Sequence, residues 1–427
     1  MKPLLFLHRL MRNFLILVII LMTQLTQINA QELQKNLFDS YEQFQEKAIT
    51  KRRFGHATLV NLLEKLKANP LFDVQIVEKS TEGRAIYQVK VGNGPTKVLL
   101  WSQMHGNEAT ATMALMDIFN FLGKDTPAYS DFKRTLLEKC TFYFVPMLNP
   151  DGAEAWSRYT ALGIDMNRDA LALQTPEGRL LKNLVKTLKP DFGFNLHDKD
   201  RRYSAGQTGN LATMSFLATA YNEAQEVNDV RKKAMQVIVQ MNRGLQQYLP
   251  NCVGKWPSDF EPRAFGDNIQ KWGTSLILIE SGGFKNDPEK QYIRKLNYIS
   301  ILSALNSVAT KSYINETTET YDALPVNGKA IFDLIIRNVT IQKGKVNYVA
   351  DIAINRGEEP VSGGDGFVNT STVEEIGDMS VFFGTEEIDG KGLTIQAKKE
   401  ISLGMKANFT LLKNDEVKYV IINGVIQ

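Results

Sequence analysis

The residues of this sequence best suited to chemistry are a histidine and a glutamate three positions apart, His105 and Glu108. They follow the apolar run from Val98 to Trp101 and precede residues 109–121, whose pattern predicts a helix. An imidazole nitrogen and a carboxylate oxygen can both bind zinc, and two ligands from one short segment need a third from elsewhere in the fold. Alone, this spacing more often marks a histidine in a loop beside a solvated glutamate.

A third ligand is available in His197, one of only four histidines in the chain. It ends a second apolar run, residues 192–197, and the carboxyl ends of strands are where open α/β sheets place their ligands. Three protein ligands leave one zinc position open for water, which is typical of a catalytic site. The sequence therefore predicts one zinc ion per chain, held by His105, Glu108 and His197.

A further carboxylate, Glu280, follows the almost continuous apolar run from Thr274 to Ile279. Such a run is typical of a buried strand, and its end would face the same sheet edge as the two ligand segments. Glu280 is therefore a candidate general base, whereas without the three ligands it would be a solvated loop carboxylate.

The elements that must position these residues alternate between strands and helices. Strands are predicted around residues 74–77, 86–91, 98–101, 142–146, 192–197 and 274–279. Helices are predicted within 31–72, over 109–121, after Thr175, through most of 213–249 and from Asp287 onward. This order indicates an α/β fold with a mixed, mostly parallel sheet flanked by helices over residues 31–316.

From residue 317 to 427 the pattern changes to short alternating runs separated by Gly-rich turns. This predicts a small all-β sandwich domain. It contains no His or Cys and no recognisable reactive cluster. We therefore expect this region to have a stabilising or docking role, in preference to a specific binding function.

The N-terminus, residues 1–30, has the basic, apolar and polar order of a signal peptide, with Ala30 before the expected cleavage site. We expect an exported protein, periplasmic or extracellular, without a stable membrane span after cleavage; an uncleaved anchor is the alternative. The net charge of +3 and scattered basic residues give no reason to expect a nucleic-acid partner. Cys140 and Cys252 could pair in an oxidising compartment or remain free thiols.

Taken in order, several motifs resemble the zinc metallocarboxypeptidases, the family of carboxypeptidase A, and point to an exported bacterial member. They extend over about residues 50–310. The motifs are His105-Gly106-Asn107-Glu108, Asn149-Pro150-Asp151-Gly152, residues 163–169, Pro176-Glu177, Asn195-Leu196-His197 and Leu278-Ile279-Glu280.

The resemblance implies a role for each matching residue. His105, Glu108 and His197 would bind zinc, and Asp165 would orient the first histidine. Asn167 and Arg168 would hold the free C-terminal carboxylate of a peptide, a group that a planar guanidinium suits. Arg158 would stabilise the developing oxyanion, and Glu280 would act as general base.

Some positions depart from the family pattern. Thr160 stands where an asparagine is common, and Asp198 follows the second histidine in place of a small polar residue. The tyrosine that covers the site in many members is not identified by spacing, although Tyr248 is present. The pocket for the terminal side chain is expected between Trp256 and Trp272.

The function predicted from the sequence is removal of C-terminal residues from peptides by a zinc-activated water. An amidase or deacylase of the same fold, acting on peptidoglycan stem peptides or acylated amino acids, is the first alternative. A catalytically inactive exported binding protein is the second. The sequence does not indicate the oligomeric state or the preferred terminal residue.

Overall fold

The computed structural model describes residues 32–427, and the predicted signal peptide lies outside this range. Among the described residues, no helix combines the length and apolar character that crossing a membrane requires. Export therefore stays a prediction. Both cysteines are free thiols in the structure, Cys140 buried and Cys252 half-buried.

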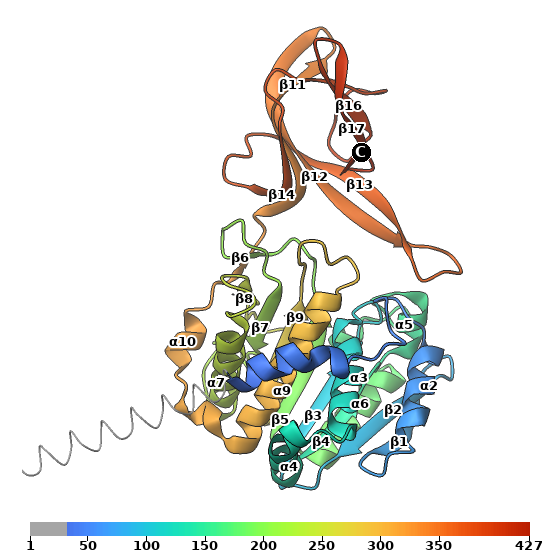
Figure 1. Ribbon diagram of the computed structural model, residues 1–427, viewed down its shortest axis with the longest axis vertical. Coiled ribbons are helices and arrows are strands. Elements are labelled where there is room, and N and C mark those ends of the chain that lie inside the picture. Colours follow the sequence, from blue (N-terminus) through green and yellow to red (C-terminus); the bar gives the residue numbers. More distant parts are fainter. Residues whose placement is uncertain (1–31) are drawn as a thin grey trace, which may run out of the picture.

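The centre of the fold is an eight-stranded mixed sheet with parallel strands in its middle (Figure 1). Antiparallel pairings flank this middle, β1 with β2 and β2 with β4 on one side and β9 with β7 on the other, and the edge strand β8 is parallel to β7. In spatial order the strands are β1 (Asp73–Lys79), β2 (Ala85–Val91), β4 (Cys140–Val145), β3 (Thr96–Ser102), β5 (Phe192–Asp198), β9 (Ser275–Ser281), β7 (Met214–Ala218) and β8 (Val253–Lys255). The predicted mixed, mostly parallel α/β sheet is confirmed.

Helices cover both faces of this sheet because its central strands are apolar on both sides. In β3, Val98 and Leu100 pack into the larger core with α2 (His56–Leu66), α3 (Thr110–Gly123), α4 (Ser130–Lys139), α7 (Asp229–Leu245) and α9 (Gln291–Thr310). Leu99 and Trp101 face the other way, toward α6 (Pro176–Leu188) and α8 (Phe265–Lys271). Two-sided burial explains why these strands read as continuous apolar runs.

Two sequence predictions need correction. Residues 214–218 were expected to be part of a helical region but form β7, which pairs with β9 inside the sheet. Its Met, Leu and Ala favour helices, yet every residue of the strand is buried, and burial overrides that weak preference. The last long helix begins at Gln291 rather than at Asp287, whose carboxylate instead accepts hydrogen bonds from the backbone of residues 291–293.

Shorter elements complete this region. They are a helix over residues 32–40, α5 (Pro150–Ala155), α10 (Thr318–Asp322), β6 (Ser204–Ala205) and the 3-10 turns Tyr41–Gln43, Pro127–Tyr129, Met166–Arg168 and Ser312–Asn315. β6 pairs with β10 (Asn327–Gly328), so the connection into the C-terminal region is tied back to the loop that follows β5.

The C-terminal region is all-β, as predicted, with its own apolar core. Its strands are β11 (Ile331–Lys343), β12 (Val346–Pro360), β13 (Phe367–Gly377), β14 (Phe383–Asp389), β15 (Thr394–Gln396), β16 (Phe409–Lys413), β17 (Glu416–Ile422) and β18 (Val425–Ile426). They form one continuous hydrogen-bonded sheet, not two separate ones, because both β14 and β15 pair with the long strand β11. The 31–316 and 317–427 division remains our proposal for the domain limits.

Candidate metal centre

Strand ends bring the predicted ligands together. His105 lies in the loop after β3, and Glu108 lies in the same loop, two residues before α3. His197 is near the end of β5, the strand that pairs with β3. Glu280, on β9, lies directly opposite His197 in the parallel register. The segments that carry the candidate ligands therefore lie at one edge of the sheet, as expected from the sequence.

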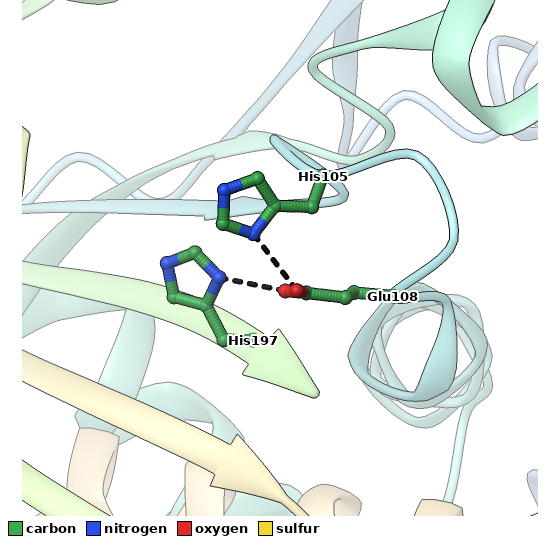
Figure 2. A group of neighbouring side chains, drawn as sticks. All are labelled: His105, Glu108 and His197. Carbon is green, nitrogen blue, oxygen red and sulfur yellow. Dashed lines mark hydrogen bonds and ion pairs between the residues drawn. The ribbon is translucent and has the colours of Figure 1, made fainter. Parts of the chain in front are cut away.

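The His105, Glu108 and His197 side chains are buried and point at one another (Figure 2). Glu108 lies between the two imidazoles, with Oε1 2.8 Å from His105 Nδ1 and Oε2 2.7 Å from His197 Nδ1. One candidate ligand atom from each residue lies within 4.8 Å of the others. Burying this polar set is costly unless charge is compensated, because charged groups lose their hydration.

The donor set fits zinc. Two imidazole Nδ1 atoms and a carboxylate face one small volume, and zinc prefers nitrogen and oxygen donors of this kind. Burial opposes ionisation of Glu108, but the two neighbouring histidines outweigh it and lower the pKa of this carboxyl far below its usual range. A carboxylate whose ionised form is favoured in this way suits a cation site.

Asp165 supports the first histidine from behind. Its Oδ1 lies 3.1 Å from His105 Nε2 and accepts the backbone N–H of Asn167 at 2.8 Å. Burial lowers the pKa of His105, but Glu108 and Asp165 together raise it to about 9. This contact leaves Nδ1 as the ring atom facing the cluster, which is the arrangement by which a carboxylate fixes the tautomer of a metal-binding histidine.

Arg158 joins Asp165 to the cluster. Its Nε lies 3.0 Å from Asp165 Oδ2, while Nη1 lies 3.2 Å from His105 Nδ1 and 3.4 Å from Glu108 Oε1. The side chain is 38% exposed, so its guanidinium borders the cavity as well as the buried cluster. It can therefore donate to an oxygen that develops negative charge beside the three ligands.

Glu280 is buried in the same cavity, and within residues 32–427 its Oε2 has no hydrogen-bond partner. Burial and the nearby Glu108 together raise the pKa of Glu280 to about 8, although Lys199 opposes the rise. Bound zinc would favour the ionised form, since a nearby dication stabilises a carboxylate. An unpartnered carboxylate at this place is suited to accept a proton.

Asn167 and Arg168 lie at the rim of the same cavity. Asn167 Oδ1 accepts the backbone N–H of Phe265 at 3.0 Å, which joins the 3-10 turn to α8. Arg168 is 38% exposed and lies 3.3 Å from a carboxylate oxygen of Glu261. A negatively charged ligand would compete with Glu261 for this guanidinium.

The cavity has a volume of about 680 Å³. Its wall includes Trp256 and the stretch that leads to Asp267, where the pocket for a terminal side chain was expected, whereas Trp272 packs in the core behind α8. Burial raises the pKa of Asp267 to about 7. Tyr248 is not a lining residue; its ring stacks on Phe38 at 4.1 Å.

The two positions that depart from the family pattern, Thr160 and Asp198, both make local hydrogen bonds. Thr160 donates its hydroxyl to Ile164 O at 3.2 Å, within its own turn. Asp198 accepts from Thr110 Oγ1 at 2.6 Å and lies 3.1 Å from Lys290 Nζ. Asp198 also donates its backbone N–H to Glu108, so this position helps to hold a candidate ligand.

Sequence reasoning missed part of the cavity wall. Lys199 is buried, and its Nζ donates to Ala212 O and Ser215 Oγ at 2.6 Å each. Arg356, Glu358 and Phe367 also line the cavity, although they belong to the C-terminal β region. No local pattern identifies these three, because only the tertiary fold brings them to the site.

Part of the sequence that forms this site is similar to a known family. Residues 59–195 match the sequence profile of a family described as zinc carboxypeptidase. This segment is therefore similar to that family, and it makes up less than half of the chain. The matched segment contains His105, Glu108, Arg158 and Asp165 and ends just before His197.

Curated relatives match over a similar length. "Probable carboxypeptidase 2" of Trichophyton verrucosum is 30% identical over 136 residues, which are 31% of this chain and 25% of the relative. "Carboxypeptidase 2" of Trichophyton rubrum is 31% identical over 136 residues, 31% of this chain and 24% of the relative. The match thus spans about a quarter of the length of these relatives.

Two solved structures share part of this fold's outline at low sequence identity. A metallo-carboxypeptidase from Burkholderia cenocepacia has a TM-score of 0.47 at 15% identity, covering 61% of this chain and 70% of that one. Carboxypeptidase A from Helicoverpa armigera has a TM-score of 0.46 at 16% identity, covering 66% of this chain and 80% of that one.

Proposed function

We propose that this protein is a zinc-dependent metallocarboxypeptidase that removes C-terminal residues from peptides. The observation that carries the proposal is the buried cluster of His105, Glu108 and His197 with the unpartnered carboxylate of Glu280 in the same cavity. The similarity of residues 59–195 to the zinc carboxypeptidase family supports it independently.

His105, Glu108 and His197 would hold the zinc ion, which supplies a water of lowered pKa and polarises a carbonyl oxygen. Glu280 then accepts a proton from the attacking water and later donates it to the leaving amine. Arg158 donates to the oxyanion of the tetrahedral intermediate, and Asp165 keeps that arginine and His105 in position.

Asn167 and Arg168 would bind the terminal carboxylate of the substrate. The guanidinium of Arg168 is half-exposed at the cavity rim, and its pairing with Glu261 is exchangeable for a substrate carboxylate. Such binding makes a free C-terminus the defining feature of the substrate.

The test is digestion of a mixed peptide library, synthesised with free and with amidated C-termini, followed by mass spectrometry. We expect loss of single residues from the free C-termini only, and loss of activity on chelation that zinc restores. Cleavage of acylated amino acids or peptidoglycan stem peptides without trimming of the library would support the amidase alternative. Zinc binding without any turnover would support an inactive binding protein.

A further inference from the structure

The C-terminal β region reaches the metal cavity through one hairpin, residues 356–371 at the end of β12 and the start of β13, which we name the β arm. Figure 1 shows this hairpin extending away from the rest of the β region and across the upper edge of the sheet toward α5. Arg356, Gly357, Glu358 and Phe367 of the arm line the same cavity as the metal cluster.

The base of the arm is fixed to the loop that follows His197. Arg201 donates to Asp333 Oδ2 at 2.8 Å and to the backbone carbonyl of Arg356 at 3.1 Å. Asp333 is buried on β11 and also accepts the backbone N–H of Arg356 at 2.7 Å. The Asp333 carboxylate thus joins the loop that follows His197 to Arg356, the first residue of the arm.

The tip of the arm is fixed to the segment before α2. Arg53 Nη1 donates to the backbone carbonyls of Val361 and Gly366, at 2.8 and 3.3 Å. Lys51 pairs with Asp365 at 2.7 Å. Hydrogen bonds to two carbonyls of one hairpin loop hold it more specifically than a single ion pair between exposed side chains does.

Between these anchors, aromatic and charged contacts close the arm over the cavity. The Phe367 ring lies 5.4 Å from that of Trp156, and the Arg52 guanidinium lies 4.2 Å above Phe367. Arg52 also pairs with Glu358 at 2.5 Å, and this arginine side chain is only 13% exposed. Arg52 thus makes a cation–π contact with Phe367 and an ion pair with Glu358. Shielding from water strengthens the attraction between the guanidinium and the ring.

We propose that the β arm is the specificity-determining wall of this site, which admits flexible peptide ends and excludes folded proteins. The inference rests on the proposed function for its substrate class. A cavity of about 680 Å³ is of the size that encloses a small ligand, so only a short length of chain fits beneath the arm. A folded domain close to the scissile bond would collide with the arm.

The test uses variants of the full chain that loosen the tip without altering the cavity lining. One is the double variant Arg53→Ala with Asp365→Asn, which removes the tip anchors. The other replaces residues 361–366 with an Asn-Gly hairpin turn between Pro360 and Phe367, which already pair. The matched control is Lys345→Ala, in the exposed turn at the other end of β12.

Two substrates with the same C-terminal residues are compared, one a short peptide and the other a folded protein without a flexible tail. We expect kcat/KM for the folded protein to rise about tenfold in both arm variants relative to the peptide, which corresponds to about 1.4 kcal/mol. The control should keep the wild-type ratio. An unchanged ratio in the shortened-arm variant would overturn the proposal.

A second readout does not depend on peptidase activity. Zinc is removed from the loaded protein by a small chelator or by the same chelator coupled to dextran. We expect the dextran-coupled form to act slowly on the wild type and faster on the shortened arm, with equal rates for the small form. If no peptide is cleaved but this difference appears, the proposed function fails while the arm retains its role; equal dextran rates would overturn the role of the arm.

Discussion

The substitution Asp165→Asn tests how the cluster is held without touching a ligand. The carboxylate contacts His105 Nε2 through Oδ1 and two nitrogens of Arg158 through Oδ2, all at 3.0–3.1 Å. An amide can accept at only one of these oxygens, so its NH2 group must face a donor on the other side. Either His105 loses its orientation or Arg158 is displaced.

The expected magnitude follows from this geometry. Loss of a carboxylate that orients a metal-binding histidine typically reduces metal affinity by about 10- to 100-fold. Burial opposes ionisation of Asp165, but His105 and Arg158 outweigh it and hold the pKa of Asp165 well below its usual range. The wild type therefore carries this charge at every pH above about 4. Because Asp165 also raises the pKa of His105, the two proteins are compared at one pH above 9, where no proton on His105 competes with zinc.

The assay is a zinc competition titration against a chromophoric chelator at fixed ionic strength. Asp200→Asn is the matched control, because Asp200 lines the same cavity but pairs with Arg202 and contacts none of the three ligands. We expect the control to retain wild-type affinity. Equal zinc affinities for the wild type and Asp165→Asn, with both proteins folded, would refute the reasoning.

Three further predictions concern single side chains. Glu280→Gln should keep its zinc but lose about 10²- to 10⁴-fold in kcat, because only the proton acceptor is removed. Steady-state kinetics together with metal analysis checks this, and full activity would exclude Glu280 as the base. Arg168→Ala should lower kcat/KM for free C-termini by about 10- to 100-fold and leave amidated peptides unaffected, whereas equal losses would argue against terminal-carboxylate binding. Burial raises the pKa of Glu177 to about 6 from 4.5, so the folded state loses about 2 kcal/mol of stability as the pH rises from 4 to 7. Glu177→Gln removes this loss, and denaturant unfolding at both pH values should show the variant gaining about 2 kcal/mol over the wild type between them; a constant difference would contradict the assignment.

The sequence predicted the site where each candidate ligand follows an apolar run that forms a buried strand. Val98 to Trp101 and Phe192 to Leu196 are strands buried on both faces, so apolar composition alone located them, and the polar residues that follow are His105 and His197. Parallel strands place such ends at one edge, which is why spacing in the sequence predicted proximity in space.

Other parts depend on tertiary context that no local window contains. Met214–Ala218 has helix-favouring residues but forms a strand, because it is buried and pairs with β9 on one side and β8 on the other. Arg52 and Phe367 are more than 300 positions apart in the sequence, yet they meet over the cavity. An arginine before a helix and a phenylalanine in a strand are both common. The contact between the β region and the cavity could therefore not be predicted from the composition of that region.

The central claim is that His105, Glu108 and His197 hold one zinc ion beside Glu280. X-ray anomalous scattering on crystals of the zinc-loaded protein, measured on both sides of the zinc absorption edge, tests it most directly. We expect a single strong zinc peak between the two histidine Nδ1 atoms and the Glu108 carboxylate, within the cavity that Glu280 lines. A crystal with no zinc peak at these residues, or with zinc bound only elsewhere, would contradict the account.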